Sequence, residues 1–128
     1  MTSLVLPAVP RSTSVARRAM VVCLGKSGVP ADQIDDAAVV LSELVTNAVL
    51  HGGRKTTDDH LEVTWTVLRD RVRLSVRDSG RCGRLAPGRA CSGATSGRGL
   101  RIVEHLSDRW CVQENGGTLV TAELGLVG

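Results

Sequence analysis

Residues 43–52 read E-L-V-T-N-A-V-L-H-G and form the end of a predicted amphipathic helix. Glu43, Asn47 and His51 recur every four residues, so they form one line along the helix, away from its apolar stripe. A carboxylate one turn from an amide oxygen can hold a divalent cation, and it can also take a proton from a hydroxyl or a water. The same line is typical of a solvated helix face, which is the simpler interpretation of these residues alone.

This helix is the second of two that are predicted in the first half of the chain. Ser12 or Thr13 is expected to cap the first helix, which runs to about Lys26. Asp32 is expected to cap the second, which runs to about Leu50. The core stripe of the second helix is expected to consist of Ile34, Ala38, Leu41, Val45 and Ala48.

Strands and turns fill most of the remaining chain. Alternating apolar and polar residues predict strands at 61–68 and 71–77, joined by a tight turn at Arg69-Asp70. The other predicted elements are an edge strand at 3–6, a helix from about Arg98 to Leu106, and strands near 109–114 and 118–124. Three helices must then cover one face of a mainly antiparallel, mixed sheet. The expected fold is α/β, a two-layer sandwich, with residues 1–128 in a single domain.

A second group of candidate residues follows the strand at 71–77. Asp78-Ser79-Gly80 stands where that strand ends, and an aspartate there can accept a hydrogen bond from an amine. Gly80 has no side chain and would let a ligand approach the backbone. An ordinary turn has the same composition, so this tripeptide by itself does not define a site.

The third group lies in a glycine-rich region. Residues 80–97 contain several arginines and no acid, and we expect them to form a flexible loop. Gly97-Arg98-Gly99-Leu100 then begins a helix, where unobstructed backbone N–H groups can bind phosphate. A lone G-x-G is weak evidence, because glycines also cap helices.

Composition excludes several classes of function. The 16 Lys and Arg residues exceed the 13 Asp and Glu residues by only three, and Trp65 and Trp110 are the only aromatic residues, so a nucleic-acid-binding surface is not expected. Neither a membrane span nor a secretory signal is recognisable, so we expect a cytoplasmic protein with no membrane partner. The four cysteines contain no C-x-x-C pair and are expected to be reduced, with a Cys82–Cys91 disulfide as the alternative.

Taken in order, the three groups resemble the motifs of the GHKL superfamily of ATP-binding domains, which includes gyrase B, Hsp90, histidine kinases and MutL. Residues 43–52 resemble its N-box, Asp78 to Gly80 its D-x-G box, and Gly97 to Leu100 its second glycine box. Residues 81–96 would be the ATP lid, and 116–124 the closing strand. The resemblance implies the Bergerat-type ATP-binding fold.

Within that superfamily, the sequence is most similar to the anti-sigma-factor serine/threonine kinases. The phrases L-V-T-N-A-V-x-H-G, G-R-G-L-x-I-V and D-R-W carry this likeness. It implies ATP and Mg²⁺ as cofactors. It also implies an anti-anti-sigma-type protein as substrate, a sigma factor as a further partner, and a homodimer.

The resemblance also implies roles for individual residues. Asn47 would coordinate Mg²⁺, and Glu43 would be the catalytic base or orient the attacking group. Asp78 would bind the adenine amino group, with Gly80 giving access and Thr118 supporting the site. The residues next to the phosphates would be Gly97, Arg98, Gly99 and Leu100. His51 would either lie near the ligand or pack at the helix end.

Two other functions stay open at this point. The chain could be a non-catalytic module that uses ATP only to set a conformation and sequesters a regulatory partner. It could also be an unrelated α/β domain whose glycine loop binds another phosphate ligand. The presence of Glu43 favours the enzyme over the first alternative, because a pure binder does not need that carboxylate.

Overall fold

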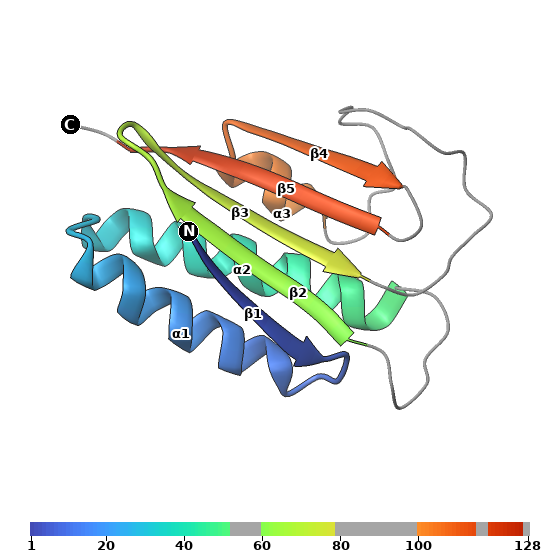
Figure 1. The fold of residues 1–128 in the computed structure, drawn as a ribbon. Helices are drawn as coiled ribbons and strands as arrows, with labels where there is room; N and C mark the ends of the chain where they lie inside the picture. Colours follow the sequence, from blue (N-terminus) through green and yellow to red (C-terminus); the bar gives the residue numbers. More distant parts are fainter. Residues whose placement is uncertain (52–59, 79–99, 115–117, 127–128) are drawn as a thin grey trace.

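The computed structural model describes residues 1–51, 60–78, 100–114 and 118–126. Figure 1 shows eight elements in this part of the chain. They are β1 (Thr2–Pro7), α1 (Ser12–Lys26), α2 (Ala31–His51), β2 (His60–Val67), β3 (Arg71–Asp78), α3 (Leu100–Leu106), β4 (Arg109–Glu114) and β5 (Thr118–Gly125). Each corresponds to a predicted element. The predicted loop at 80–97 and the turn at 115–117 lie outside the described residues.

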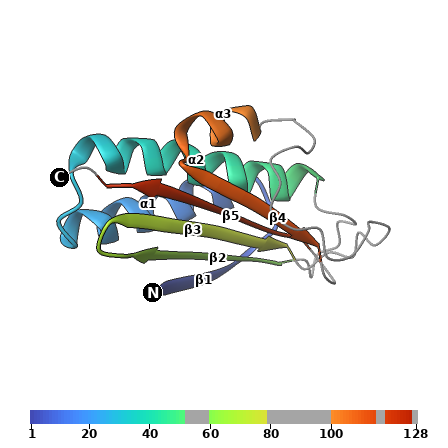
Figure 2. The same cartoon turned by 90° about the horizontal axis from the view of Figure 1, so that it is seen from above.

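The five described strands form one sheet in the order β1-β2-β3-β5-β4. All four pairings between neighbouring strands are antiparallel. The three described helices lie on one face of this sheet, so the molecule has two layers (Figure 2). The predicted α/β two-layer sandwich is therefore confirmed, and the described part of the sheet is entirely antiparallel.

The core lies between the sheet and the helices. Val72, Leu74 and Val76 alternate along β3 and are buried, because successive side chains of a strand point to opposite faces. From the helix layer, Leu41 and Val45 of the predicted stripe are fully buried. Each such side chain contributes roughly 1.5–3 kcal/mol through its removal from water.

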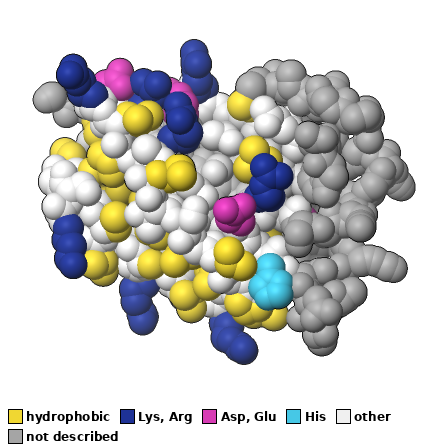
Figure 3. Space-filling model, in the orientation of Figure 1, with side chains coloured by type: hydrophobic (Ala, Val, Ile, Leu, Met, Phe, Trp, Pro, Cys, Tyr) yellow, Lys and Arg dark blue, Asp and Glu magenta, His cyan; other side chains and the backbone are white. Residues whose placement is uncertain are grey.

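The opposite face of the sheet carries none of the three described helices and is the face seen in Figure 3. Hydroxyl and charged side chains lie there between scattered apolar ones. Ser3 and Thr64 form a hydrogen bond between β1 and β2, with 3.0 Å between their oxygens. Glu62 and Arg77 approach within 3.8 Å between β2 and β3. These outer positions alternate with buried apolar ones, because successive side chains of a strand point to opposite faces.

Both predicted helix caps are wrong. Arg11 occupies the N-cap of α1 without a side-chain cap bond, and the Ser12 hydroxyl donates instead to the carbonyl of Pro7 at 2.6 Å. α2 begins at Ala31, so Asp32 lies inside its first turn rather than before it. There the carboxylate is still favourable beside the positive end of the helix dipole. Local composition identified the helix starts to within two residues but not the residues that precede them as caps.

Turn chemistry agrees with the prediction between β2 and β3. The backbone N–H of Leu68 donates to the carbonyl of Arg71 at 2.7 Å, which closes a turn over Arg69-Asp70.

None of the described helices is both long enough and apolar enough to cross a membrane.

Candidate functional site

Three elements that carry candidate residues end or begin at the same end of the molecule. β3 finishes there with Asp78, β5 starts there with Thr118, and the last turn of α2 reaches the same end behind the sheet (Figures 1 and 2). Residues far apart in the sequence are thus brought to one end of the two-layer sandwich.

Asp78 is buried although it is an aspartate. Its exposed fraction is 6%, and among the described residues only Ser12 and Asp78 are buried polar or charged side chains. It follows the buried positions of β3 in the strand alternation, so its side chain lies on the helix-covered face. Burying a carboxylate costs free energy unless polar groups or a ligand compensate it. Its burial at the end of β3 distinguishes this position from an ordinary surface turn.

Thr118 lies directly beside Asp78 in the sheet. The two residues are register partners in the β3–β5 pairing, and Leu61 is the partner of Asp78 on the β2 side. Thr118 is half-buried and Leu61 is buried. The structure thus brings Asp78 and Thr118 together, and Leu61 adds an apolar neighbour that sequence reasoning missed. Strand register could have identified it, because positions opposite each other in a ladder share a face.

Glu43 and Asn47 are half-buried on α2. Ser42 faces α1, since its hydroxyl accepts a hydrogen bond from Arg17 at 3.4 Å. At about 100° per residue, Glu43 points roughly 100° away from Ser42 and Asn47 roughly 140° away. Both residues therefore point away from the direction of Ser42 on α2.

The remaining candidates are only partly described. His51 is the last residue of α2 and Leu100 the first of α3, which places their backbones but not their side chains. Gly80, Gly97, Arg98 and Gly99 lie outside the described residues, as do Cys82 and Cys91.

The two described cysteines differ. Cys23 is free, whereas Cys111 is disulfide-bonded. The expectation of four reduced thiols is therefore wrong at Cys111.

A metal cage built from protein side chains is absent from the described residues. No group of three or more His, Cys, Asp or Glu side chains is placed there to hold an ion. Mg²⁺ does not need such a cage, because it is commonly held by one or two protein oxygens together with substrate phosphates. The Asn47 amide on a half-buried helix face fits that second kind of site.

Comparison with known families gives a match over nearly the whole chain. A family model described as "Histidine kinase-like ATPase domain" matches residues 6–124. That range includes every candidate residue named above.

Curated relatives share one name. A serine-protein kinase RsbW of Bacillus velezensis is 28% identical over 126 residues, which cover 90% of this chain and 79% of that protein. The RsbW of Bacillus subtilis is 26% identical over the same shares of the two chains. A Listeria monocytogenes RsbW is 28% identical over 78 residues, so the match spans 61% of this chain and half of that protein's length.

A solved structure with the same fold comes from Mycobacterium tuberculosis. It is the crystal structure of the RsbU and RsbW domains of Rv1364c, which superimposes with a TM-score of 0.68 at 23% identity. The superposition covers 98% of this chain and 33% of that one.

Proposed function

Because this chain belongs to the family of histidine kinase-like ATPase domains, we propose that it binds ATP with Mg²⁺ and phosphorylates a partner protein on serine or threonine. The observation that carries the proposal is Asp78, a carboxylate that is only 6% exposed at the end of the central strand β3, where a family-type nucleotide site would lie. A buried carboxylate is an acceptor for the amino group of adenine, and guanine presents a carbonyl oxygen at that position. The proposed site therefore prefers ATP to GTP.

Recognition of the base is assigned to Asp78, Gly80 and Thr118. The register pairing of Asp78 with Thr118 supports this assignment, since both face the same side of the sheet. Leu61, buried on the other side of Asp78, gives the base an apolar neighbour. Polar groups at one edge of an otherwise apolar pocket fix the orientation of a flat ligand.

Magnesium is assigned to Asn47. The amide oxygen is a hard ligand, and phosphate oxygens would complete the coordination of the ion. When bound, the ion neutralises charge that develops on the phosphate during transfer. Phosphate contacts are assigned to Gly97, Arg98, Gly99 and Leu100, and His51 is placed near the ligand.

Glu43 is assigned as the catalytic base. The hydroxyl oxygen of the partner's serine attacks the γ-phosphorus, the bond to the bridging oxygen breaks, and ADP leaves. Glu43 accepts the hydroxyl proton, or orients the hydroxyl, in this step. Its position one turn before Asn47 on the same side of α2 supports a role beside the phosphates.

The relatives named serine-protein kinase RsbW support a protein substrate. We infer an anti-anti-sigma-type protein as the phosphate acceptor and a sigma factor as a second partner. We also infer that the chain forms a homodimer.

Transfer of labelled phosphate tests the enzymatic half of the proposal. The wild-type chain and Glu43→Gln are incubated with γ-labelled ATP and a recombinant anti-anti-sigma-type protein as the probe. Loss of a general base slows transfer by roughly 100-fold or more, while ATP affinity stays within about threefold. Asp36→Asn, exposed on the same helix, is the matched control.

Full-rate transfer by Glu43→Gln would refute the role of that residue. ATP binding with no transfer by the wild-type chain, while the probe protein is still retained, would favour the non-catalytic module instead.

A further inference from the structure

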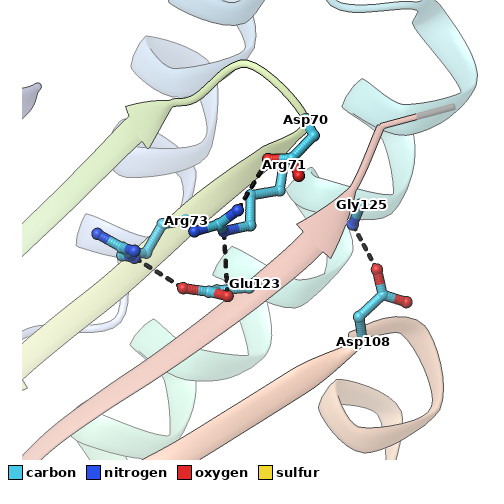
Figure 4. A network of polar contacts seen from close by, with 6 residues as sticks. All are labelled: Asp70, Arg71, Arg73, Asp108, Glu123 and Gly125. Carbon is cyan, nitrogen blue, oxygen red and sulfur yellow. Dashed lines mark hydrogen bonds and ion pairs between the residues drawn. The ribbon is translucent and has the colours of Figure 1, made fainter. Parts of the chain in front are cut away.

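Asp108 connects α3 to the far end of β5 through two hydrogen bonds. Its backbone N–H donates to the carbonyl of Glu123 at 2.8 Å. Its carboxylate accepts the backbone N–H of Gly125 at 2.6 Å (Figure 4). One residue between a helix and a strand thus contacts two positions on the neighbouring strand.

The side-chain bond replaces a missing ladder bond. The β4–β5 register starts with Arg109 opposite Glu123, because the chain before Arg109 turns away into α3. No β4 residue is paired with Gly125, and the Asp108 carboxylate supplies the acceptor there. A Cβ on residue 125 would lie 2.5 Å from Oδ2 of Asp108, so a glycine is required for this approach.

α3 depends on such contacts for its position. It has seven residues, too few for a helix that is stable by itself. Val103 is fully buried, and the N–H of Ser107 closes the last turn on the carbonyl of Val103 at 2.9 Å. Asp108 follows immediately, so its two bonds fix this end of α3 on the sheet. At 1.5 Å per residue, the other end, Leu100, is about 10 Å away.

We propose that Asp108 is a positioning residue for nucleotide binding: its contact with Gly125 sets the placement of α3 and, through it, of the Leu100 backbone at the start of that helix. The proposal rests on the proposed function, in which Leu100 contacts the phosphates. The base is assigned to β3 and β5, which Asp108 does not hold at their Asp78–Thr118 end. Loss of the contact should therefore weaken recognition of the phosphates and leave recognition of the base intact.

Titrations of wild type and Asp108→Ala with Mg-ATP and with adenosine test this separation. We expect Asp108→Ala to bind Mg-ATP about tenfold more weakly, since small displacements of binding groups have effects of this order, and adenosine as tightly as wild type. Asp108→Asn keeps an acceptor for Gly125 and should restore most of the ATP affinity. Asp70→Ala is the matched control: this exposed aspartate at the same end of the sheet pairs with Arg71 and does not contact the α3–β4 connection (Figure 4).

The outcomes distinguish this proposal from the proposed function. Equal loss of ATP and adenosine affinity, or unchanged ATP affinity, in folded Asp108→Ala would overturn the positioning role. If that variant does not fold, Gly125→Ala displaces the carboxylate by a clash, and normal ATP binding by it would also overturn the role. Wild-type chain that binds no ATP would refute the proposed function itself.

Discussion

At the scale of single residues, Asp78 is the position where structure adds most to sequence. D-S-G after a strand is a common turn, and composition cannot distinguish a surface aspartate from a buried one. The structure places this carboxylate in the strand alternation, on the same face as Val76. A charged group on that face is expensive unless it serves binding or is compensated by neighbours.

We predict that Asp78→Asn weakens ATP binding by at least about tenfold, because a hydrogen bond to a charged acceptor contributes roughly 1.5–3 kcal/mol. GTP binding, weak in the wild type, should not change. Calorimetric titration with each nucleotide measures both quantities, with Asp70→Asn, a 72%-exposed aspartate, as the control. ATP affinity equal to that of the wild type would refute the adenine assignment.

At the scale of elements, α1 is attached to β1 through one buried hydroxyl. Ser12 is 2% exposed, and its bond to the carbonyl of Pro7 links the first residue of α1 to the last of β1. The sequence suggested a cap for this serine, and the structure uses the same donor for a contact between elements. Short polar side chains at helix starts serve either purpose, and the path of the preceding chain decides between them.

We predict that Ser12→Ala lowers the free energy of unfolding by about 1–2 kcal/mol, since it removes a buried hydrogen bond. Ser14→Ala should cost much less, because the Ser14 hydroxyl is exposed and its bond to the carbonyl of Arg11 is 3.3 Å long. Urea unfolding of the two variants gives the comparison. Equal effects would mean that the bond to Pro7 does not stabilise the β1–α1 connection.

The pairing of β3 with β5 includes a three-residue ion cluster. The Glu123 carboxylate lies 3.2 Å from Nε of Arg71 and 2.9 Å from Nε of Arg73 (Figure 4). The Glu123 side chain is 16% exposed, whereas the arginines are 37% and 43% exposed. Solvent therefore screens the arginine side of the cluster, and its contribution stays modest.

We predict that Glu123→Ala destabilises the protein by about 1 kcal/mol at low salt and by less at high salt. Glu62→Ala should have almost no effect, because Glu62 and Arg77 are both about half exposed and 3.8 Å apart. Unfolding curves at two ionic strengths separate the cases. A salt-independent loss in Glu123→Ala would assign the effect to packing rather than to charge.

At the scale of the whole molecule, the sequence predicted the helices and strands better than it predicted which of them pair and contact one another. Alternation at 61–68 and 71–77 was sufficient for β2 and β3, because a half-buried strand must repeat every two residues. The pairing of Asp78 with Thr118 and the contact of Asp108 with Gly125 join residues 40 and 17 positions apart. A pattern within a few neighbouring residues carries no information about partners so far apart in the sequence. The order of the strands was therefore not predictable from the sequence and is seen only in the structure.

For the candidate site too, some features could be predicted from local sequence and others could not. The line of Glu43, Asn47 and His51 follows from helix geometry alone, and the structure places all three in α2. The resemblance of the motifs to one family supplied their roles, and the family is confirmed by the match over residues 6–124. The single domain, the cytoplasmic location and the homodimer stay predictions.

Calorimetric titration of the purified chain with Mg-ATP and with Mg-GTP tests the proposed nucleotide site most directly. We expect saturable binding of ATP that requires Mg²⁺, is tighter than the binding of GTP, and is lost in Asn47→Ala, while Asp36→Asn binds ATP normally. Absence of ATP binding at millimolar concentration, or undiminished Mg²⁺-dependent binding in Asn47→Ala, would contradict the proposed site.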